Sequence, residues 1–205
     1  MASRGDTTRE RLVVAAEALL LRHGYAGMSL DELLRETGLS KGAFFHHFPG
    51  KAALARAVLA HYADTDLALF ESWAERADRL SDDPLERVLI FLRLFEEHLD
   101  QQESPPPGCV FASFTYQRAE LDAELHAMVR QRLARWQGLF AERLEALIAV
   151  RPPALRVDAE ALAELIVAVI EGGLITANIT GDGKLLQRLS GQLRTYLTAL
   201  FQPPR

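Results

Sequence analysis

Apolar residues recur every three or four positions along nearly the whole chain, which is the spacing of one face of an α-helix. No stretch shows the strict alternation that is typical of a half-buried strand. The pattern therefore predicts an all-α fold of nine helices. The expected helices cover residues 7–23, 30–36, 41–47, 51–80, 84–102, 109–119, 122–149, 158–180 and 184–201, each bound being uncertain by about two to four residues.

The boundaries between these helices carry recognisable signals. Ser29 precedes Glu32 at capping-box spacing, in which a hydroxyl and a carboxylate satisfy exposed N–H groups. Asp83 followed by Pro84 is a strong helix start, because proline loses nothing at the first helical position. The run of prolines at 105–107 cannot continue a helix, so it separates two of them.

The segment 29–51 reads as a short helix, a turn around Gly38 and a second short helix, which is the plan of a helix-turn-helix. On a helical wheel Phe44 and Phe48 fall together and would face inward. The opposite side carries small and polar residues, which would let the backbone approach base edges in a DNA major groove. We predict DNA contacts from Ser29, Ser40, Lys41, Gly42, Ala43, Phe45, His46 and Lys51.

Two other interpretations of this segment stay open at the level of sequence. The aromatic run 44–48 could be a packed corner without any role in DNA binding. The adjacent histidines 46 and 47 could suggest a metal ion, but neighbouring helical residues point about 100° apart and no third ligand is near. We expect no metal site.

Charge and composition narrow the class of protein. The net charge is −5, but residues 1–60 hold eight Lys or Arg against six Asp or Glu, while the remainder holds 15 against 22. This distribution fits nucleic-acid binding at one end of an acidic chain. The one cysteine, Cys109, excludes an internal disulfide and favours a reducing compartment, so we expect a cytoplasmic protein.

Residues 161–179 are apolar enough to suggest a membrane helix. Glu164, Glu171 and Asn178 lie within that stretch, and carboxylates at a bilayer centre are costly. We therefore interpret it as a helix inside a folded protein. The start of the chain also lacks the apolar run of a signal peptide.

Residues 7–54 resemble the N-terminal domain of TetR-family transcriptional regulators. The similarity is carried by Ala15-Ala16-x-x-Leu19-Leu20, His23-Gly24-Tyr25, Ser29-Leu30-Asp31-Glu32-Leu33, the run from Thr37 to Phe48, and Lys51-x-x-Leu54. The resemblance implies a homodimer that binds a palindromic DNA operator, usually as a repressor, and releases it when a small-molecule effector binds. It also implies a DNA-binding domain at 1–50 and a dimerisation and effector domain at 51–205. The family commonly has tyrosine where this chain has Phe45, so one phosphate hydrogen bond is lost.

The helix at 158–180 is apolar around most of its circumference, and Gly172-Gly173 in its middle suggests that another helix approaches closely. In the family the last two helices pair with their copies in a four-helix interface. The resemblance thus predicts a dimer interface that contains Glu171, Gly172, Gly173, Leu189, Leu193 and Tyr196.

An effector pocket is expected among the middle helices by the same resemblance, and its predicted lining is Phe95, Phe114, Tyr116 and Trp136. Singly, each of these residues could equally belong to an ordinary core, and Cys109 could be either a small buried hydrophobe or a redox sensor. An enzyme or a purely helical interaction module remains the alternative. However, the chain shows no phosphate-binding loop, no nucleophile elbow and no His-Glu-x-x-His motif, so we expect neither catalytic residues nor a cofactor.

Overall fold

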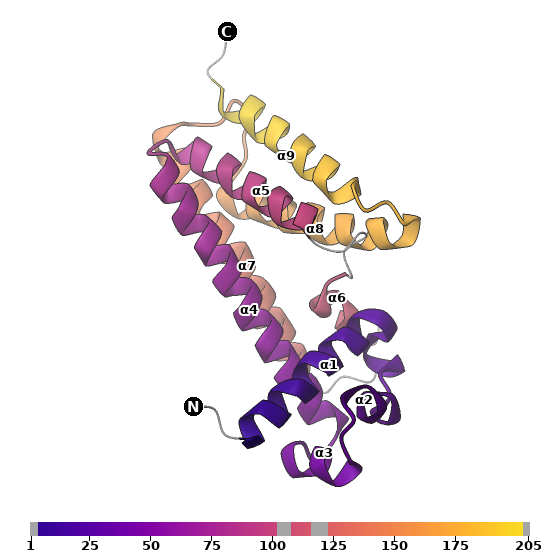
Figure 1. Cartoon of the computed structure of the whole chain (residues 1–205). Helices are drawn as coiled ribbons and strands as arrows, with labels where there is room; N and C mark the ends of the chain where they lie inside the picture. The colour runs from indigo at the N-terminus through magenta and orange to yellow at the C-terminus, as the bar shows by residue number, and fades with distance from the viewer. Residues whose placement is uncertain (1–3, 102–107, 116–122, 203–205) are drawn as a thin grey trace. The chain divides into compact units, whose positions relative to one another are not determined.

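The computed structural model describes residues 4–101, 108–115 and 123–202, and within these ranges it contains nine α-helices and no strand. Figure 1 shows the helices in chain order. They are α1 (Arg4–Gly27), α2 (Leu30–Thr37), α3 (Lys41–His47), α4 (Lys51–Leu80), α5 (Pro84–Gln101), α6 (Val110–Thr115), α7 (Ala123–Val150), α8 (Ala159–Thr180) and α9 (Leu185–Phe201). The all-α prediction is confirmed.

The chain forms two compact units. The head unit comprises Met1–Asp66 and Cys109–Gln131, and the body unit comprises Leu67–Gly108 and Arg132–Arg205. This grouping differs from the predicted division at residue 50, because α6 and the first part of α7 pack with the N-terminal helices. Contacts of this kind between distant segments leave no mark in local periodicity.

The head unit has a core made by α1, α2, α3 and the start of α4, to which α6 adds aromatic side chains. Tyr25 of α1 packs on Phe114 with ring centroids 5.6 Å apart, and Tyr62 of α4 meets Phe111 edge to face at 5.3 Å. Phe114 is fully buried in this contact. It therefore packs in the core of the head unit, and its predicted place in the lining of an effector pocket stays a prediction.

The core of the body unit is an aromatic cluster. Phe70 of α4 contacts Trp73, Phe91, Trp136 and Phe140, with centroid distances between 4.9 and 6.5 Å. These are the offset and edge-to-face separations that aromatic pairs prefer. Burial of such large side chains from α4, α5 and α7 supplies much of the apolar area that holds the unit together.

Two other predicted pocket residues lie in this same unit. Trp136 is buried against Phe70, and Phe95 is buried near Trp73 with centroids 6.1 Å apart. Tyr116 lies outside the described residues. Phe95 and Trp136 thus pack in the core of the body unit, and their part in an effector pocket stays a prediction.

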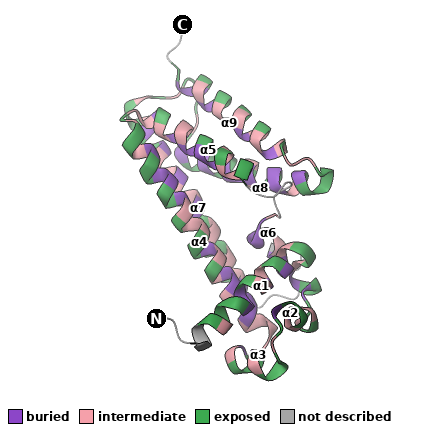
Figure 2. Cartoon of the chain, in the orientation of Figure 1, coloured by how far each residue is buried: buried purple, intermediate pink, exposed green. Residues whose placement is uncertain are grey.

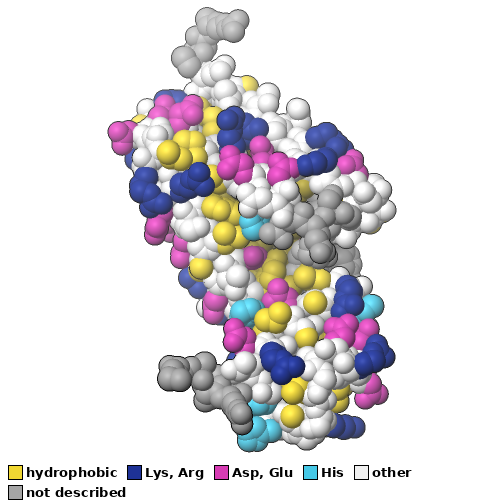
Figure 3. Space-filling view, viewed as in Figure 1, with side chains coloured by type: hydrophobic (Ala, Val, Ile, Leu, Met, Phe, Trp, Pro, Cys, Tyr) yellow, Lys and Arg dark blue, Asp and Glu magenta, His cyan; other side chains and the backbone are white. Residues whose placement is uncertain are grey.

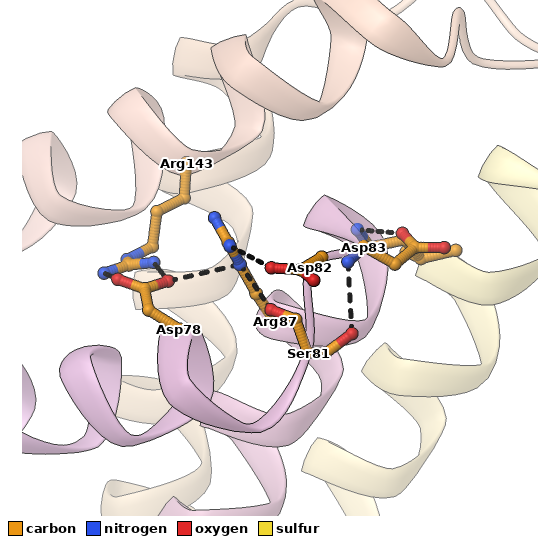
Figure 4. A network of polar contacts seen from close by, with 7 residues as sticks. Asp78, Ser81, Asp82, Asp83, Arg87 and Arg143 are labelled. Atoms are coloured by element: carbon orange, nitrogen blue, oxygen red, sulfur yellow. Dashed lines mark hydrogen bonds and ion pairs between the residues drawn. The ribbon is translucent and has the colours of Figure 1, made fainter.

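One polar network fastens the turn between α4 and α5 to α7 (Figure 4). The guanidinium of Arg143 donates to both carboxylate oxygens of Asp78 at 2.9 and 3.1 Å, and Arg87 lies 3.6 Å from both Asp78 and Asp82. The hydrogen bonds from the Arg143 guanidinium are the main cause that holds the pKa of Asp78 below its usual range. The pair is partly solvated, so its contribution is modest.

We expect Asp78→Asn to lower the free energy of unfolding by about 0.5–1 kcal/mol at neutral pH. Because the folded-state pKa is depressed, this stabilisation is present above the ordinary Asp pKa of about 3.9 and is lost as pH falls through the lower folded value. Urea unfolding of both chains from pH 7 to pH 3 should show the difference shrinking in acid. Asp82→Asn is the control, since that carboxylate is fully exposed. A difference that stays constant into acid would contradict this interpretation.

Candidate nucleic-acid interface

The short helices α2 and α3 of the head unit both begin with side-chain caps. The Oγ of Ser29 accepts a hydrogen bond from the Glu32 N–H at 3.4 Å, and the Oγ of Ser40 accepts one from the Ala43 N–H at 3.2 Å. Between the helices Gly38 adopts φ 66° and ψ 19°, a left-handed conformation that glycine adopts without strain. The sequence thus fixes the angle at which α3 leaves α2. Each serine O–H can still donate to a phosphate oxygen.

α3 has one buried side and one open side. Phe44 and Phe48 are almost fully buried, in contact with each other at 5.9 Å between centroids, as the wheel predicted. The residues on the other side are exposed, and Figure 2 shows this outer side of α3 in the colours of exposed and intermediate residues. Lys41, Gly42, Phe45 and His46 are exposed and Ala43 is half-buried. Their contact with DNA remains a prediction.

Phe45 is the most unusual member of this surface, because its side chain is apolar and 47% exposed. Its ring lies edge-on to Phe44 at 5.2 Å between centroids. In Figure 3 histidine side chains gather at the end of the unit that α3 forms. A small backbone-exposing glycine, an open phenylalanine and imidazoles on one short helix suit a surface that meets base edges and sugar.

Lys51 has internal partners that the sequence did not indicate. Its Nζ donates to the carbonyl oxygen of Ala26 at 3.0 Å and lies 4.8 Å from the centroid of the Tyr25 ring. The side chain therefore joins the start of α4 to the end of α1. The predicted phosphate contact of the Lys51 ammonium competes with these internal bonds, whereas the N–H groups at the start of α4 still suit a phosphate.

We expect Lys51→Met to lower the melting temperature by about 2–4 °C, which corresponds to about 1 kcal/mol in a chain of this size. Operator affinity should fall as the head loosens, while the slope of log affinity against log salt should stay unchanged, because no phosphate contact is removed. Lys41→Met is the matched control. Lys41 is exposed on α3, so its removal should reduce the slope by about one and leave the melting temperature unchanged. A reduced salt slope in Lys51→Met would instead show that the Lys51 ammonium contacts a phosphate.

Sequence reasoning missed Arg11, which supports the turn of the motif. Its guanidinium donates to the Thr37 carbonyl at 2.7 Å, and the Thr37 hydroxyl donates to the Leu33 carbonyl at the same distance. The Arg11 bond ties α1 to the last turn of α2, and the Thr37 bond lies within α2 itself. The sequence gives little indication of this role, because Arg11 is one of several charged residues on the solvated side of its helix.

A second surface of interest lies on α8 and α9 of the body unit. The two helices pack against each other, yet α8 has an apolar and small-residue side that its own chain leaves open. Leu165 is 40% exposed and Ile179 is 79% exposed. Apolar and small exposed residues repeat every three or four positions along α8, at Ala161, Leu165, Ala168, Gly172, Thr176 and Ile179, and the helix also exposes Glu160, Glu164, Asn178 and Thr180.

Two residues predicted for the pairing face are buried in their own chain instead. A Cβ on Gly173 would clash with the Leu186 Cδ1 and lie 3.2 Å from the Leu189 Cδ1, so this glycine allows α9 to pack on α8. Leu193 is also buried in the core. Gly172 is exposed and a Cβ there would meet nothing within 4 Å.

The other predicted members of the face are at least partly accessible. Tyr196 is 37% exposed, and Glu171 and Leu189 are half-buried. By length and composition α8 could cross a membrane, and it is the one helix of the described residues for which this holds. A side-by-side partner explains its open apolar side equally well, and Glu160, Glu164 and Glu171 favour that explanation.

Comparison with known sequences agrees with this geometry. The profile of the bacterial regulatory proteins of the tetR family matches residues 12–58. The profile of the LmrA/YxaF-like transcriptional regulator C-terminal domain matches residues 84–192, which is more than half of the chain. The chain belongs to the TetR family. It is therefore a DNA-binding transcriptional regulator, and in helix-turn-helix proteins generally the second helix of the motif lies in the major groove.

Individual relatives of this TetR-family chain show the same organisation over most of its length. The uncharacterized regulator YxaF of Bacillus subtilis (strain 168) is 26% identical over 194 residues, covering 94% of this chain and 96% of YxaF. The transcriptional repressor NemR of Escherichia coli (strain K12) is 28% identical over 141 residues, which are 67% of each chain. The crystal structure of a TetR regulator from Chloroflexus aurantiacus J-10-FL is 28% identical with a TM-score of 0.81, covering 96% and 97% of the two chains.

Proposed function

We propose that this TetR-family regulator is a cytoplasmic repressor that binds a palindromic operator as a homodimer and leaves it when a small apolar or amphipathic effector binds. The observation that carries the proposal is the open side of α3, where Gly42, Phe45 and His46 are exposed while two phenylalanines anchor the helix from behind. The similarity to NemR, whose name states that it is a repressor, supports this mode of regulation.

Dimerisation is the second part of the proposal. A single reading helix covers only half of a two-fold symmetric site, so an operator of this kind needs two copies. The apolar side of α8, with exposed Tyr196 of α9 beside it in the same helix pair, is the surface proposed to pair. The partner copy would then cover the exposed side chains of Leu165 and Ile179. Removing large apolar side chains from water favours such pairing.

We also propose that residues 1–50 bind DNA and that residues 51–205 carry the dimer interface and the effector site. The described part of the chain contains no cluster of three or more His, Cys, Asp or Glu side chains that could hold a metal ion. We propose that the effector binds against apolar walls with a few polar groups.

Binding to genomic DNA fragments tests the proposal. Fragments retained by the protein should share a two-fold symmetric sequence, and affinity for it should fall steeply between 50 and 200 mM salt because phosphate contacts release counterions. Retained fragments without any common sequence would contradict sequence-specific binding. A monomer bound to a single half-site would contradict the dimer.

A further inference from the structure

The head unit contains a hollow that DNA reading does not require. It has a volume of about 110 Å³ and lies among the end of α1, the start of α2, α3 and the start of α4. Its walls are almost entirely apolar. They are formed by Met28, Ser29, Leu30, Leu33, Phe44, Phe45, Gly50, Lys51 and Leu54.

Two further observations on residues of the wall agree with an unfilled space. A Cβ added to Gly50 would meet no atom within 4 Å, so this wall carries no side chain where one would fit. Phe45 is 47% exposed, although its neighbours Phe44 and Leu54 in the same wall are about 1% exposed. The ring of Phe45 thus forms the solvent-facing edge of this apolar space.

The polar atoms of the lining bond to partners outside the hollow. The Lys51 ammonium is directed to the Ala26 carbonyl and the Tyr25 ring, and the Ser29 oxygen accepts from the Glu32 N–H. The hollow is partly open to solvent at Phe45, and an occupant would meet mostly carbon along its walls. A space with so few polar partners favours a small apolar molecule over ordered water.

We infer that this hollow is a binding site for a single-ring apolar molecule, such as a substituted benzene, and that it is separate from the effector site proposed in the body unit. An engineered apolar cavity of about 150 Å³ holds benzene. The hollow of about 110 Å³ is smaller, so a ring fits only if the Phe45 side chain moves outward. Edge-to-face contact with Phe44 would then favour an aromatic occupant.

Occupancy has a direct consequence for DNA binding. Ser29 and Phe45 are walls of the hollow and also predicted DNA contacts. A ring that displaces Phe45 changes the surface that meets DNA, so occupancy weakens operator binding. By linkage, operator DNA weakens binding of the ring by the same factor, for which couplings of fivefold to 150-fold are typical.

Fluorobenzene is a suitable probe, because its ¹⁹F signal reports binding in the absence of DNA. We expect saturable binding to the full chain, and at least tenfold weaker binding to Gly50→Leu, whose side chain fills the hollow. Gly138→Leu is the matched control. Gly138 also has no atom within 4 Å of an added Cβ, but it belongs to α7 and does not line the hollow. If Gly50→Leu does not fold, Leu30→Phe fills the same space from α2.

The site is overturned if fluorobenzene shows no saturable binding, or if it binds Gly50→Leu and Leu30→Phe as tightly as the unchanged chain. The coupling is tested separately by operator affinity with and without fluorobenzene. We expect a loss of fivefold or more in the unchanged chain and in Gly138→Leu. An operator affinity that fluorobenzene does not change would overturn the coupling. Because the ¹⁹F measurement contains no DNA, its failure is distinct from failure of the proposed repressor function.

Discussion

Replacing Gly42 with glutamate is expected to lower operator affinity by at least about 100-fold, toward the much weaker level of non-specific binding. Gly42 lies on the open side of α3, and the atom nearest to an added Cβ would be the Ser40 Oγ at 3.8 Å, an ordinary contact. The folded chain therefore accepts the larger side chain. A complex with DNA does not, because the carboxylate would enter a surface dense in phosphate charge.

Gly138→Glu is the control for this change, since it adds the same atoms and charge at an open position of α7. A gel-shift titration of both variants measures the affinity, and circular dichroism together with sedimentation checks fold and assembly. Full operator affinity in Gly42→Glu would mean that α3 does not face the groove. Equal losses in both variants would mean that added negative charge alone weakens binding.

Replacing Gly172 with glutamate is expected to raise the dissociation constant of the dimer by about 100-fold or more. In the single chain the position is open, so the fold does not resist the change. In the proposed dimer the glutamate of each copy enters an apolar contact around the two-fold axis. Burying unpaired like charges there costs several kcal/mol. Sedimentation at micromolar concentration should then show monomers with unchanged helix content.

The neighbouring glycine provides the contrast. Gly173→Ala should lower the melting temperature, because its Cβ meets Leu186 and Leu189 of α9 and over-packing costs about 1–3 kcal/mol. Gly172→Ala adds the same methyl group at an open position of the single chain. An intact dimer of Gly172→Glu would place the pairing surface on another side of the chain. An unfolded Gly172→Glu chain would show that the position is not open.

The helices and the orientation of α3 followed from local chemistry. Ser29, Ser40 and Gly38 carry cap and turn signals within a few residues, and the spacing of Phe44 and Phe48 set the buried side. These features depend on neighbours in sequence, which explains why they could be predicted. The start of α1 at Arg4 rather than near residue 7 shows the usual imprecision of helix ends.

Features that depend on distant neighbours could not be predicted in this way. The sequence around Phe114 gives no sign of its packing partner, which is Tyr25, far earlier in the chain. Gly172 and Gly173 are adjacent and chemically identical, yet one is open and the other holds α9 close. Lys51 has a carbonyl from α1 within 3.0 Å of its Nζ, a partner 25 residues earlier in the chain.

The most direct test of the account is to map where α3 lies on the operator. Cys109 is the only cysteine, so His46→Cys in a Cys109→Ser chain gives a single attachment point for an iron-EDTA cleavage reagent. We predict two clusters of cuts, one in each half-site, with centres about 10–10.5 base pairs or a multiple of that apart. Gly138→Cys in the same background should give no such pattern. Operator binding without cleavage from position 46 would contradict the claim that the open side of α3 faces the DNA.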